Sequence, residues 1–288
     1  MSKKIKQKSQ MRVLMGQTFK QNYAKVGAVL VGIIIAIALF GPLIAPYTFD
    51  EFVDAPNAVR SDQILLGADY LGRDVWSRFL FGGRTIIGLS FVSTVLGVGL
   101  GLFIGLFAAS AKSRTDSFIM RFNDILLAFP QIVFVLLVVS GFGSSIFLIA
   151  VTVGLTHAPR TARIIRAAAA EVMERDFIKA AIAVGEKRRR IIFSELLPNV
   201  TSSLLVEFGL RMTYSIGLVA AVSFLGLGLQ PPAADWGLMI NENRGSMTVQ
   251  PWAVLTPIFA IAIFTIGINF ITDSFAKVAI GIDRKGKE

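Results

Sequence analysis

Residues 26–45 read VGAVLVGIIIAIALFGPLIA, an apolar run without a single charged side chain. Because a helix rises about 1.5 Å per residue, such a run is long enough to cross the roughly 30 Å hydrocarbon core of a bilayer. Three more runs of similar length, at 86–109, 204–229 and 252–272, are also mostly apolar. These four runs place the chain among helical membrane proteins.

Residues 125–155 form a fifth apolar region, which is too long for one span. The Gly/Ser-rich string SGFGSS, typical of a tight turn, interrupts it. We therefore expect two spans here, at 125–140 and 145–160, with Pro130 and Pro159 bending or ending their helices. The prediction is an all-α integral membrane protein with six transmembrane helices.

The composition excludes several classes of protein. Hydrophobic residues make up 54% of the chain and charged residues only 17%, whereas soluble proteins are about one quarter charged. The absence of cysteine excludes disulfides, thiolate nucleophiles and cysteine-based metal sites. The sequence also lacks a phosphate-binding loop and the common hydrolase and metalloprotease signatures. We expect no catalytic residue, no metal and no ATP bound by this chain, so a gradient or a partner must supply any energy.

The positive charges predict the orientation in the membrane. Six spans place both termini on one side, and an excess of Lys and Arg marks the cytoplasmic side. The 29 Lys and Arg residues gather mainly in the tail 1–25, the loop 160–203 and the tail 277–288. Lys112, Arg114 and Arg121 fall in a second inner loop, Arg60, Arg73, Arg78, Arg84 and Arg244 fall on the opposite side, and Arg211 falls within a span. We predict an N-in, C-in transmembrane domain over 26–276, and the net charge of +10 is no sign of nucleic-acid binding.

Two outer loops are large enough to carry function, at 46–84 and about 230–250. The first contains GADYLGRDVWSR at 67–78, in which acids and bases alternate. From Asp74 onward we expect a short interfacial helix ahead of the second span. The favoured interpretation is a structural segment with local ion pairs, and the alternative is direct contact with a ligand. All three tryptophans, Trp76, Trp236 and Trp252, are expected in an aromatic belt at the outer interface.

The inner loop 160–203 is too long for a simple connection. Its Ala-rich stretches at 167–174 and 177–184 predict soluble helices, and Gly185 fits a helix terminator. The second stretch carries an apolar stripe formed by Phe177, Ala180, Ala181 and Val184. This stripe either faces a cytoplasmic partner or packs on the protein's own bundle.

Polar and small residues within the spans suggest further roles. Glycines 97, 101 and 105 share one helix face, where small residues permit close helix packing. Glu207 and Arg211 are four residues apart, as are Asn269 and Asp273. Each pair either lines a translocation path or has a structural role, in which the side chains pair between helices or extend to the membrane interface. The lone His157 is expected to pack near an inner span end.

Three ordered strings resemble one family, the inner-membrane permeases of dipeptide, oligopeptide and nickel ABC importers, specifically the C-type subunit. They are LGADYLGRD at 66–74 with Ser77-Arg78 and Gly83-Arg84, FLGLGLQPP at 224–232 with Trp236-Gly237, and an inner-loop string. In the last, Lys179-Ala180-Ala181, then Gly185, then Leu197-Pro198 is similar to the Glu-Ala-Ala…Gly…Leu-Pro motif of ABC importer permeases. Lys179 departs from the family's Glu and reverses the charge there.

The resemblance implies a type I ABC importer permease fold, a cytoplasmic coupling helix and no catalysis by this chain. It assigns contact with the ATPases to Arg175, Asp176, Phe177, Lys179, Ala180, Ala181, Gly185, Leu197 and Pro198. It assigns the outer surface that faces a binding protein to Asp69, Gly72, Arg73, Asp74, Gln230, Pro231, Pro232 and Trp236. The implied partners are a homologous B-type permease, one or two ATPases that bind ATP and Mg, and an extracytoplasmic substrate-binding protein, at a bacterial inner membrane.

The cargo stays open at this point. Di- and oligopeptides are the first expectation, and nickel or other metal chelates and glutathione are alternatives within the same architecture. A gradient-driven secondary transporter is the alternative from another class. Against it, the sequence has no detectable inverted repeat and few ionisable residues at mid-membrane. A membrane-embedded enzyme would need a cluster of reactive side chains that the sequence does not show.

Overall fold

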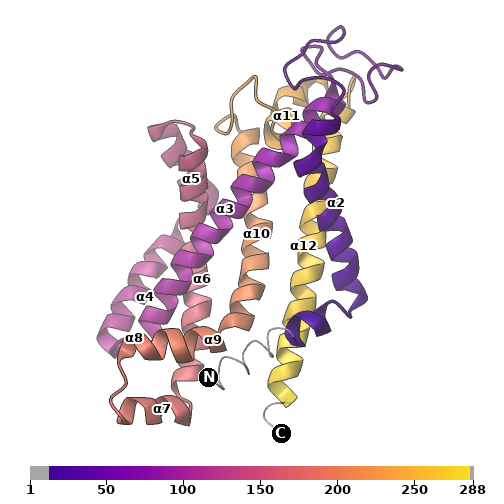
Figure 1. Cartoon of the computed structure of the whole chain (residues 1–288). Helices are drawn as coiled ribbons and strands as arrows, with labels where there is room; N and C mark the ends of the chain where they lie inside the picture. The colour runs from indigo at the N-terminus through magenta and orange to yellow at the C-terminus, as the bar shows by residue number, and fades with distance from the viewer. Residues whose placement is uncertain (1–12, 286–288) are drawn as a thin grey trace.

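A computed structural model describes residues 13–285, which form a long helical bundle (Figure 1). In that part of the chain there is no β-strand, only the isolated bridges Phe52–Arg73 and Ala68–Asp74. The all-helical prediction is therefore confirmed for the described residues. The outer parts of the two predicted tails, 1–12 and 286–288, lie outside them.

The chain runs back and forth along the bundle, with the long helices alternating in direction (Figure 1). The elements are α2 (Asn22–Ile44), α3 (Val75–Ala109), α4 (Ser113–Ala128), α5 (Gln131–Phe142), α6 (Ile146–Met173), α7 (Asp176–Ala183), α8 (Arg188–Arg190), the π-helix η1 (Ile191–Leu196), α9 (Leu197–Asn199), α10 (Thr201–Phe224), α11 (Trp236–Asn243), the 3₁₀-helix η2 (Arg244–Ser246) and α12 (Trp252–Lys285). The segment before α3 and the helix α11 lie at one end, and α7 lies at the other.

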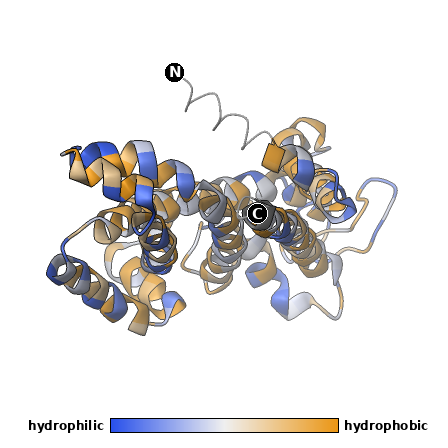
Figure 2. Cartoon of the chain, turned by 90° about the horizontal axis from the view of Figure 1, so that it is seen from below, coloured by the Kyte–Doolittle hydropathy of each residue, from blue (hydrophilic) through white to orange (hydrophobic). Residues whose placement is uncertain are grey.

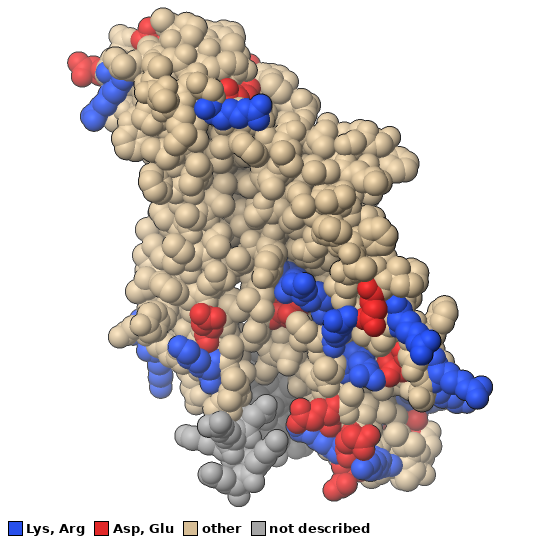
Figure 3. All heavy atoms as spheres, turned by 180° about the vertical axis from the view of Figure 1, so that it is seen from behind, with Lys and Arg blue, Asp and Glu red and all other residues tan. Residues whose placement is uncertain are grey.

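Among the described residues, four helices are long and apolar enough to cross a membrane, namely α2, α3, α10 and the 252–281 part of α12. Helices α4 and α5 qualify together as a fifth candidate, bent by 80° at the break between them. Helix α6 is not among these candidates, and its second half carries three arginines. One face of the molecule has a broad belt without charged side chains between two charged ends (Figure 3). Seen from the end that carries α7, the helices stand side by side and are largely apolar (Figure 2).

Several helix boundaries differ from the sequence prediction. The expected interfacial helix and second span form one helix, α3, which begins at Val75 where the side chain of Asp74 accepts from the Ser77 amide at 2.7 Å. Helix α6 continues through Pro159 to Met173, well beyond the predicted end of the fourth span. The breaks at Pro130 and at Gly143, where φ is 92°, occur as predicted. Helix α10 ends at Phe224, five residues short of the predicted end at 229.

The glycine face of α3 packs directly against α6, which confirms the packing interpretation. An ideal Cβ at Gly97 would lie 2.5 Å from the Gly154 carbonyl oxygen, and one at Gly101 would lie 2.6 Å from the Thr161 Cβ. A Cβ at Gly105 would meet the Ala162 carbonyl oxygen at 2.7 Å. Any side chain at these positions would force the two helices apart.

The end that carries α11, which is predicted to be the outer end, has an aromatic core, and Trp236 lies in it rather than in the predicted interfacial belt. The Trp236 side chain is fully buried, stacks on Phe79 at a centroid distance of 5.4 Å and donates its indole N–H to the Phe79 carbonyl at 2.9 Å. Trp76 stacks on the same ring at 5.6 Å. Trp236 thus fixes α11 to α3, and Trp252 is the tryptophan with a half-exposed side chain.

Candidate functional site

Helix α7 is held at the end of the bundle by one side chain. Ile178 is fully buried in an apolar cluster with Val172 of α6, Ile191 and Leu196 of η1, and Leu106 of α3. Its neighbours along α7 are mostly exposed. Burial of one isoleucine side chain stabilises its packing by roughly 1.5–3 kcal/mol. The helix is therefore anchored through Ile178, and most of its remaining surface is exposed.

The end of α7 is set by Gly185, as the sequence predicted. The chain turns there with φ at 78°, a left-handed conformation that glycine adopts without a steric penalty. The Glu186 amide donates to the Ala181 carbonyl at 3.0 Å, and the Gly185 amide donates to Ile182 at 3.0 Å. These bonds satisfy the last carbonyls of the helix and direct the chain into the basic run at 187–190.

The open face of α7 forms one side of a groove of about 310 Å³. The groove is lined by Phe177, Ala180, Ala181, Val184, Glu186, Arg190, Ile191 and Glu195. The predicted apolar stripe, formed by three α7 residues and the adjoining Val184, lies along this groove. Phe177 is 40% exposed and Val184 is 79% exposed. Small alanines between two larger apolar side chains leave room for another surface to approach closely. Such a face is suited to receiving a partner of complementary shape.

The charged residues of this loop form weak, exposed ion pairs. The Lys179 ammonium lies 3.4 Å from the Glu174 carboxylate, and Arg190 lies 3.1 Å from Glu186. Exposed pairs of this kind contribute at most about 1 kcal/mol, so they orient side chains rather than stabilise the fold. Arg175 and Asp176, at the start of α7, are also exposed. Leu197 and Pro198 lie in α9, half-buried between this loop and α10.

A buried ion cluster joins the two outer loops. The Arg73 guanidinium contacts Asp69 at 2.7 Å and Glu242 at 3.1 Å, and Arg78 contacts the same carboxylates at 3.4 and 2.8 Å. Arg78 also donates to the carbonyl of Phe49 at 2.8 Å. Two bases and two acids balance one another, and each side chain is at most 5% exposed. The cluster fastens the segment before α3 to α11.

The outer residues assigned to a binding-protein surface therefore fall into two groups. Asp69, Gly72, Arg73, Asp74 and Trp236 are buried, whereas Gln230, Pro231 and Pro232 are exposed between α10 and α11. The buried group shapes the outer end, and the exposed group is accessible to another protein. The contact with a binding protein stays a prediction.

A second polar cluster lies inside the bundle where α3, α6 and α10 meet. Arg211 and Glu207 contact at 2.8 Å, and Thr161 donates to Glu207 at 3.1 Å. The lone histidine, His157, is fully buried rather than near an interface and lies 3.0 Å from the Ser215 hydroxyl. Thr94 of α3 lies 2.8 Å from the same Ser215 hydroxyl, so the cluster ties three helices together.

Asn269 and Asp273, which are four residues apart on α12, do not form a pair in the structure. Asn269 accepts a hydrogen bond from Thr213 of α10 at 3.1 Å, which makes it a contact between helices. Asp273 is exposed one turn later. The two side chains therefore have different environments despite their spacing.

Sequence reasoning missed Glu242 and Arg188. Glu242 lies more than 160 residues from the two arginines that it contacts, so no local pattern indicates the cluster. Arg188 belongs to the basic run at 187–190, and its guanidinium donates to the Phe107 carbonyl at 2.8 Å and connects the α7 loop to the end of α3. A signal for either residue would require a pairing pattern across related sequences.

Comparison with known proteins gives two family matches. Residues 101–279 match the binding-protein-dependent transport system inner membrane component family, and residues 9–64 match the N-terminal transmembrane domain of oligopeptide transport permease C. The glutathione transport system permease protein GsiD of Pectobacterium atrosepticum is 34% identical over 256 residues, covering 88% of this chain and 85% of the relative. The protein of the same name from Escherichia coli O6:K15:H31 is also 34% identical, over 88% of this chain and 84% of its own.

Among solved structures, the inward-facing MetNI methionine ABC transporter matches with a TM-score of 0.58 and 20% identity, covering 70% of this chain and 96% of that one. At that identity the likeness concerns the fold alone. The family match extends over most of the candidate spans and over the whole α7 loop. The chain therefore belongs to the family of binding-protein-dependent transport system inner membrane components, as an ABC importer permease subunit of the C-type found in oligopeptide and dipeptide systems.

Proposed function

We propose that α7 and the turn at Gly185 are the element through which cytoplasmic ATPases drive this permease. The observation that carries the proposal is the exposed apolar stripe of α7, on a helix that the buried Ile178 anchors to the bundle. A docked ATPase that moves α7 would also move η1, α6 and the end of α3, because all four share that apolar cluster. The docking residues are those assigned from the sequence, namely Arg175, Asp176, Phe177, Lys179, Ala180, Ala181, Gly185, Leu197 and Pro198.

The proposed topology has six crossings, with α7 and both termini in the cytoplasm. The alternating directions of α2, α3, α4 with α5, α6, α10 and α12 support it (Figure 1). The basic run at 187–190 lies at the α7 end, as expected for a cytoplasmic side. In this arrangement α6 carries three arginines in its second half, and that charged half is the end next to α7.

The subunit itself performs no catalysis in this proposal. Its partners are a B-type permease, ATPases that bind ATP and Mg, and an extracytoplasmic binding protein. Two states, open inward and open outward, differ in energy, and ATP-driven closure of the ATPases selects one of them through α7. At the outer end, the exposed Gln230, Pro231 and Pro232 are the proposed contacts for the binding protein. The cluster around Glu207 and Arg211 is proposed to hold helices together beside the path.

The proposed cargo is a small peptide, and glutathione, itself a tripeptide, belongs to this class. The names of the two matched relatives and of the matched N-terminal domain support the class. Metal chelates stay the alternative. Measuring what the cognate binding protein retains on purification would decide between them, because specificity in such importers depends largely on that protein.

The docking proposal is tested by Ala181→Asp, with Ala183→Asp as the matched control. Ala181 lines the groove, whereas Ala183 is exposed on α7 outside it. A buried carboxylate at the interface costs several kcal/mol unless it is paired. We expect Ala181→Asp to insert normally but to lose ATPase copurification and substrate uptake, and Ala183→Asp to retain both. Normal uptake by the Ala181 variant would refute the docking assignment.

A further inference from the structure

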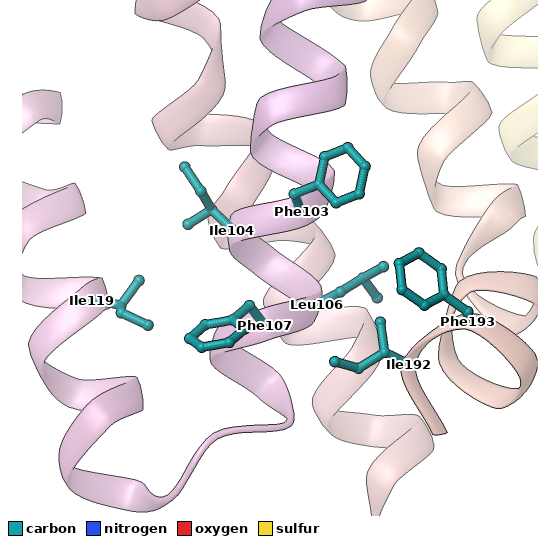
Figure 4. A pocket seen from close by; sticks show the side chains of 7 residues that line it. All are labelled: Phe103, Ile104, Leu106, Phe107, Ile119, Ile192 and Phe193. Carbon is teal, nitrogen blue, oxygen red and sulfur yellow. The ribbon is translucent and has the colours of Figure 1, made fainter. Parts of the chain in front are cut away.

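A second groove, of about 430 Å³, lies where the α7 loop meets the transmembrane helices. It is lined by Phe103, Ile104, Leu106 and Phe107 of α3, Ile119 of α4, and Ile192 and Phe193 of η1. Figure 4 shows α3 in the middle, with the α4 side chain on one side and the η1 side chains on the other. Every lining residue is apolar. The groove is distinct from the one beside α7, which contains charged residues.

The aromatic side chains of this groove are open to the outside of the chain. Phe103 is 60% exposed, Phe107 49% and Phe193 47%, whereas Leu106 is buried beneath them. The groove lies on the last two turns of α3, a helix apolar enough to span the membrane. Apolar side chains exposed at this depth are favourable against hydrocarbon rather than water.

A positive charge stands at the edge of the groove. The Arg188 guanidinium lies over the Phe107 ring, 4.4 Å from its centroid, and donates to the Phe107 carbonyl at 2.8 Å and to the Ser110 hydroxyl at 3.1 Å. Both acceptors are uncharged oxygens. A guanidinium has five N–H donors in a planar fork, so several are left to bind an anion.

The nearby carboxylates are already engaged by other bases. Asp116, about one turn before Ile119 on α4, contacts Arg166, and Glu186 contacts Arg190. Lys112, directly before α4, and Arg114, in its first turn, are exposed and add to the positive potential at this end. An apolar groove in the membrane with a cationic rim matches a molecule with a hydrocarbon chain and an anionic headgroup.

We propose that this groove binds an anionic phospholipid, with an acyl chain against Phe103, Phe107 and Phe193 and the phosphate at Arg188. Because the groove is bordered by α3, α4 and η1, the bound lipid braces the α7 loop against the spans. The proposed topology places the groove in the cytoplasmic leaflet. The binding of the lipid does not depend on that topology. The proposal is also independent of the ATPase contact, because the two grooves share no residue.

The test measures phospholipid retained by the purified transporter complex, using native mass spectrometry after reconstitution with phosphatidylglycerol or phosphatidylcholine. Arg188→Gln removes the charge, and Ile119→Trp fills the groove while leaving Arg188 in place. Arg189→Gln is the matched control, because it removes the same charge about 100° around the helix. We expect preferential retention of phosphatidylglycerol, weakened about tenfold or more by Arg188→Gln, since bonds to charged groups are worth roughly 1.5–3 kcal/mol. Ile119→Trp should also lose the lipid, and Arg189→Gln should not.

Three results would overturn the proposal. The first is equal retention of the two phospholipids by the wild-type complex. The second is an equal loss of phosphatidylglycerol in the Arg188 and Arg189 variants, which would indicate a diffuse charge effect. The third is efficient cross-linking of a cysteine at Ile104 to the second permease in the complex, which would show that protein fills the groove. A thermal unfolding midpoint for each variant verifies that the complex stays folded.

Discussion

Arg211 illustrates how strongly a single buried charge depends on its partner. Its side chain is about 4% exposed, its guanidinium contacts Glu207 at 2.8 Å, and Tyr214 lies beneath it at 4.9 Å. Nη1 finds no hydrogen-bond acceptor within residues 13–285. The carboxylate of Glu207 is therefore the main compensation for a charge that would otherwise be costly inside the bundle.

Glu207→Gln should destabilise the protein markedly. Removal of one partner from a buried ion pair costs about 3–5 kcal/mol, because the other charge is left uncompensated. The expected result is a lower thermal unfolding midpoint in detergent, which a Glu207→Leu, Arg211→Met double variant should largely restore. Asp273→Asn, at an exposed acid, is the control. A Glu207→Gln midpoint no lower than that of the control would contradict this interpretation of the pair.

Asp235 gives the outer end a pH dependence. Burial raises the pKa of its carboxyl from 3.8 to about 6, although the Leu238 amide donates to it at 3.1 Å and acts in the opposite direction. The folded state holds the proton of this carboxyl more tightly than the unfolded state does. The contribution of Asp235 to the free energy of unfolding is therefore fully present below about pH 4. This contribution, roughly 3 kcal/mol, is lost as the pH rises to about 6.

Asp235→Asn should abolish this dependence. The amide oxygen still accepts from Leu238 at the start of α11, but no ionisation occurs. We expect the wild-type midpoint to fall between pH 4 and 6 by more than that of the variant, and the variant to be the more stable of the two at pH 7. Asp50→Asn, at an exposed acid of the same end, should leave the wild-type profile unchanged. Parallel profiles for the wild type and Asp235→Asn would rule out this residue as the source.

At the scale of helices, contact between α3 and α6 depends on the absence of side chains. Gly97→Ala should destabilise the bundle by roughly 1–3 kcal/mol, because its Cβ would lie 2.5 Å from the Gly154 carbonyl oxygen. Gly99, two residues along the same helix, has nothing within 4 Å of an added Cβ. Gly99→Ala should therefore be neutral or stabilising by up to about 1 kcal/mol. The measurement is the thermal unfolding midpoint of both variants in the same detergent. Equal midpoints for Gly97→Ala and Gly99→Ala would be incompatible with close packing of α3 against α6.

The helices that could be predicted are those whose signal is local. The apolar runs, the break at Pro130 and the stop at Gly185 all depend on residues that are neighbours in sequence. The continuity of α3 with the second span was missed because its first turns carry Ser77 and Arg78, which suggest an interfacial helix until Glu242 and Asp69 are seen to compensate the charge. The candidate functional site on α7 could likewise be predicted only where its signal is local. The stripe on α7 follows from helical periodicity, whereas the anchor of Arg188 on Phe107 depends on tertiary contact.

For the whole molecule, the number of crossings can be measured directly. The chain has no cysteine, so single cysteines can be introduced without altering a native one. Positions 62 and 144 are exposed in connections, position 113 at the start of α4 and position 179 on α7. We expect Asp62→Cys and Ser144→Cys to react with an impermeant reagent in intact cells, and Ser113→Cys and Lys179→Cys to react only after permeabilisation. Protection of position 144 in intact cells would mean that α4, α5 and α6 do not add two crossings.

The central claim is that this chain is half of a gate that ATP hydrolysis in partner subunits operates through α7. The most direct measurement is peptide uptake into proteoliposomes that hold the complete transporter, with ATP trapped inside and binding protein and glutathione or a dipeptide outside. The account predicts accumulation that requires ATP, survives an uncoupler and disappears with Ala181→Asp but not with Ala183→Asp. Uptake driven by an ion gradient without ATP, or undiminished in the Ala181 variant, would contradict it.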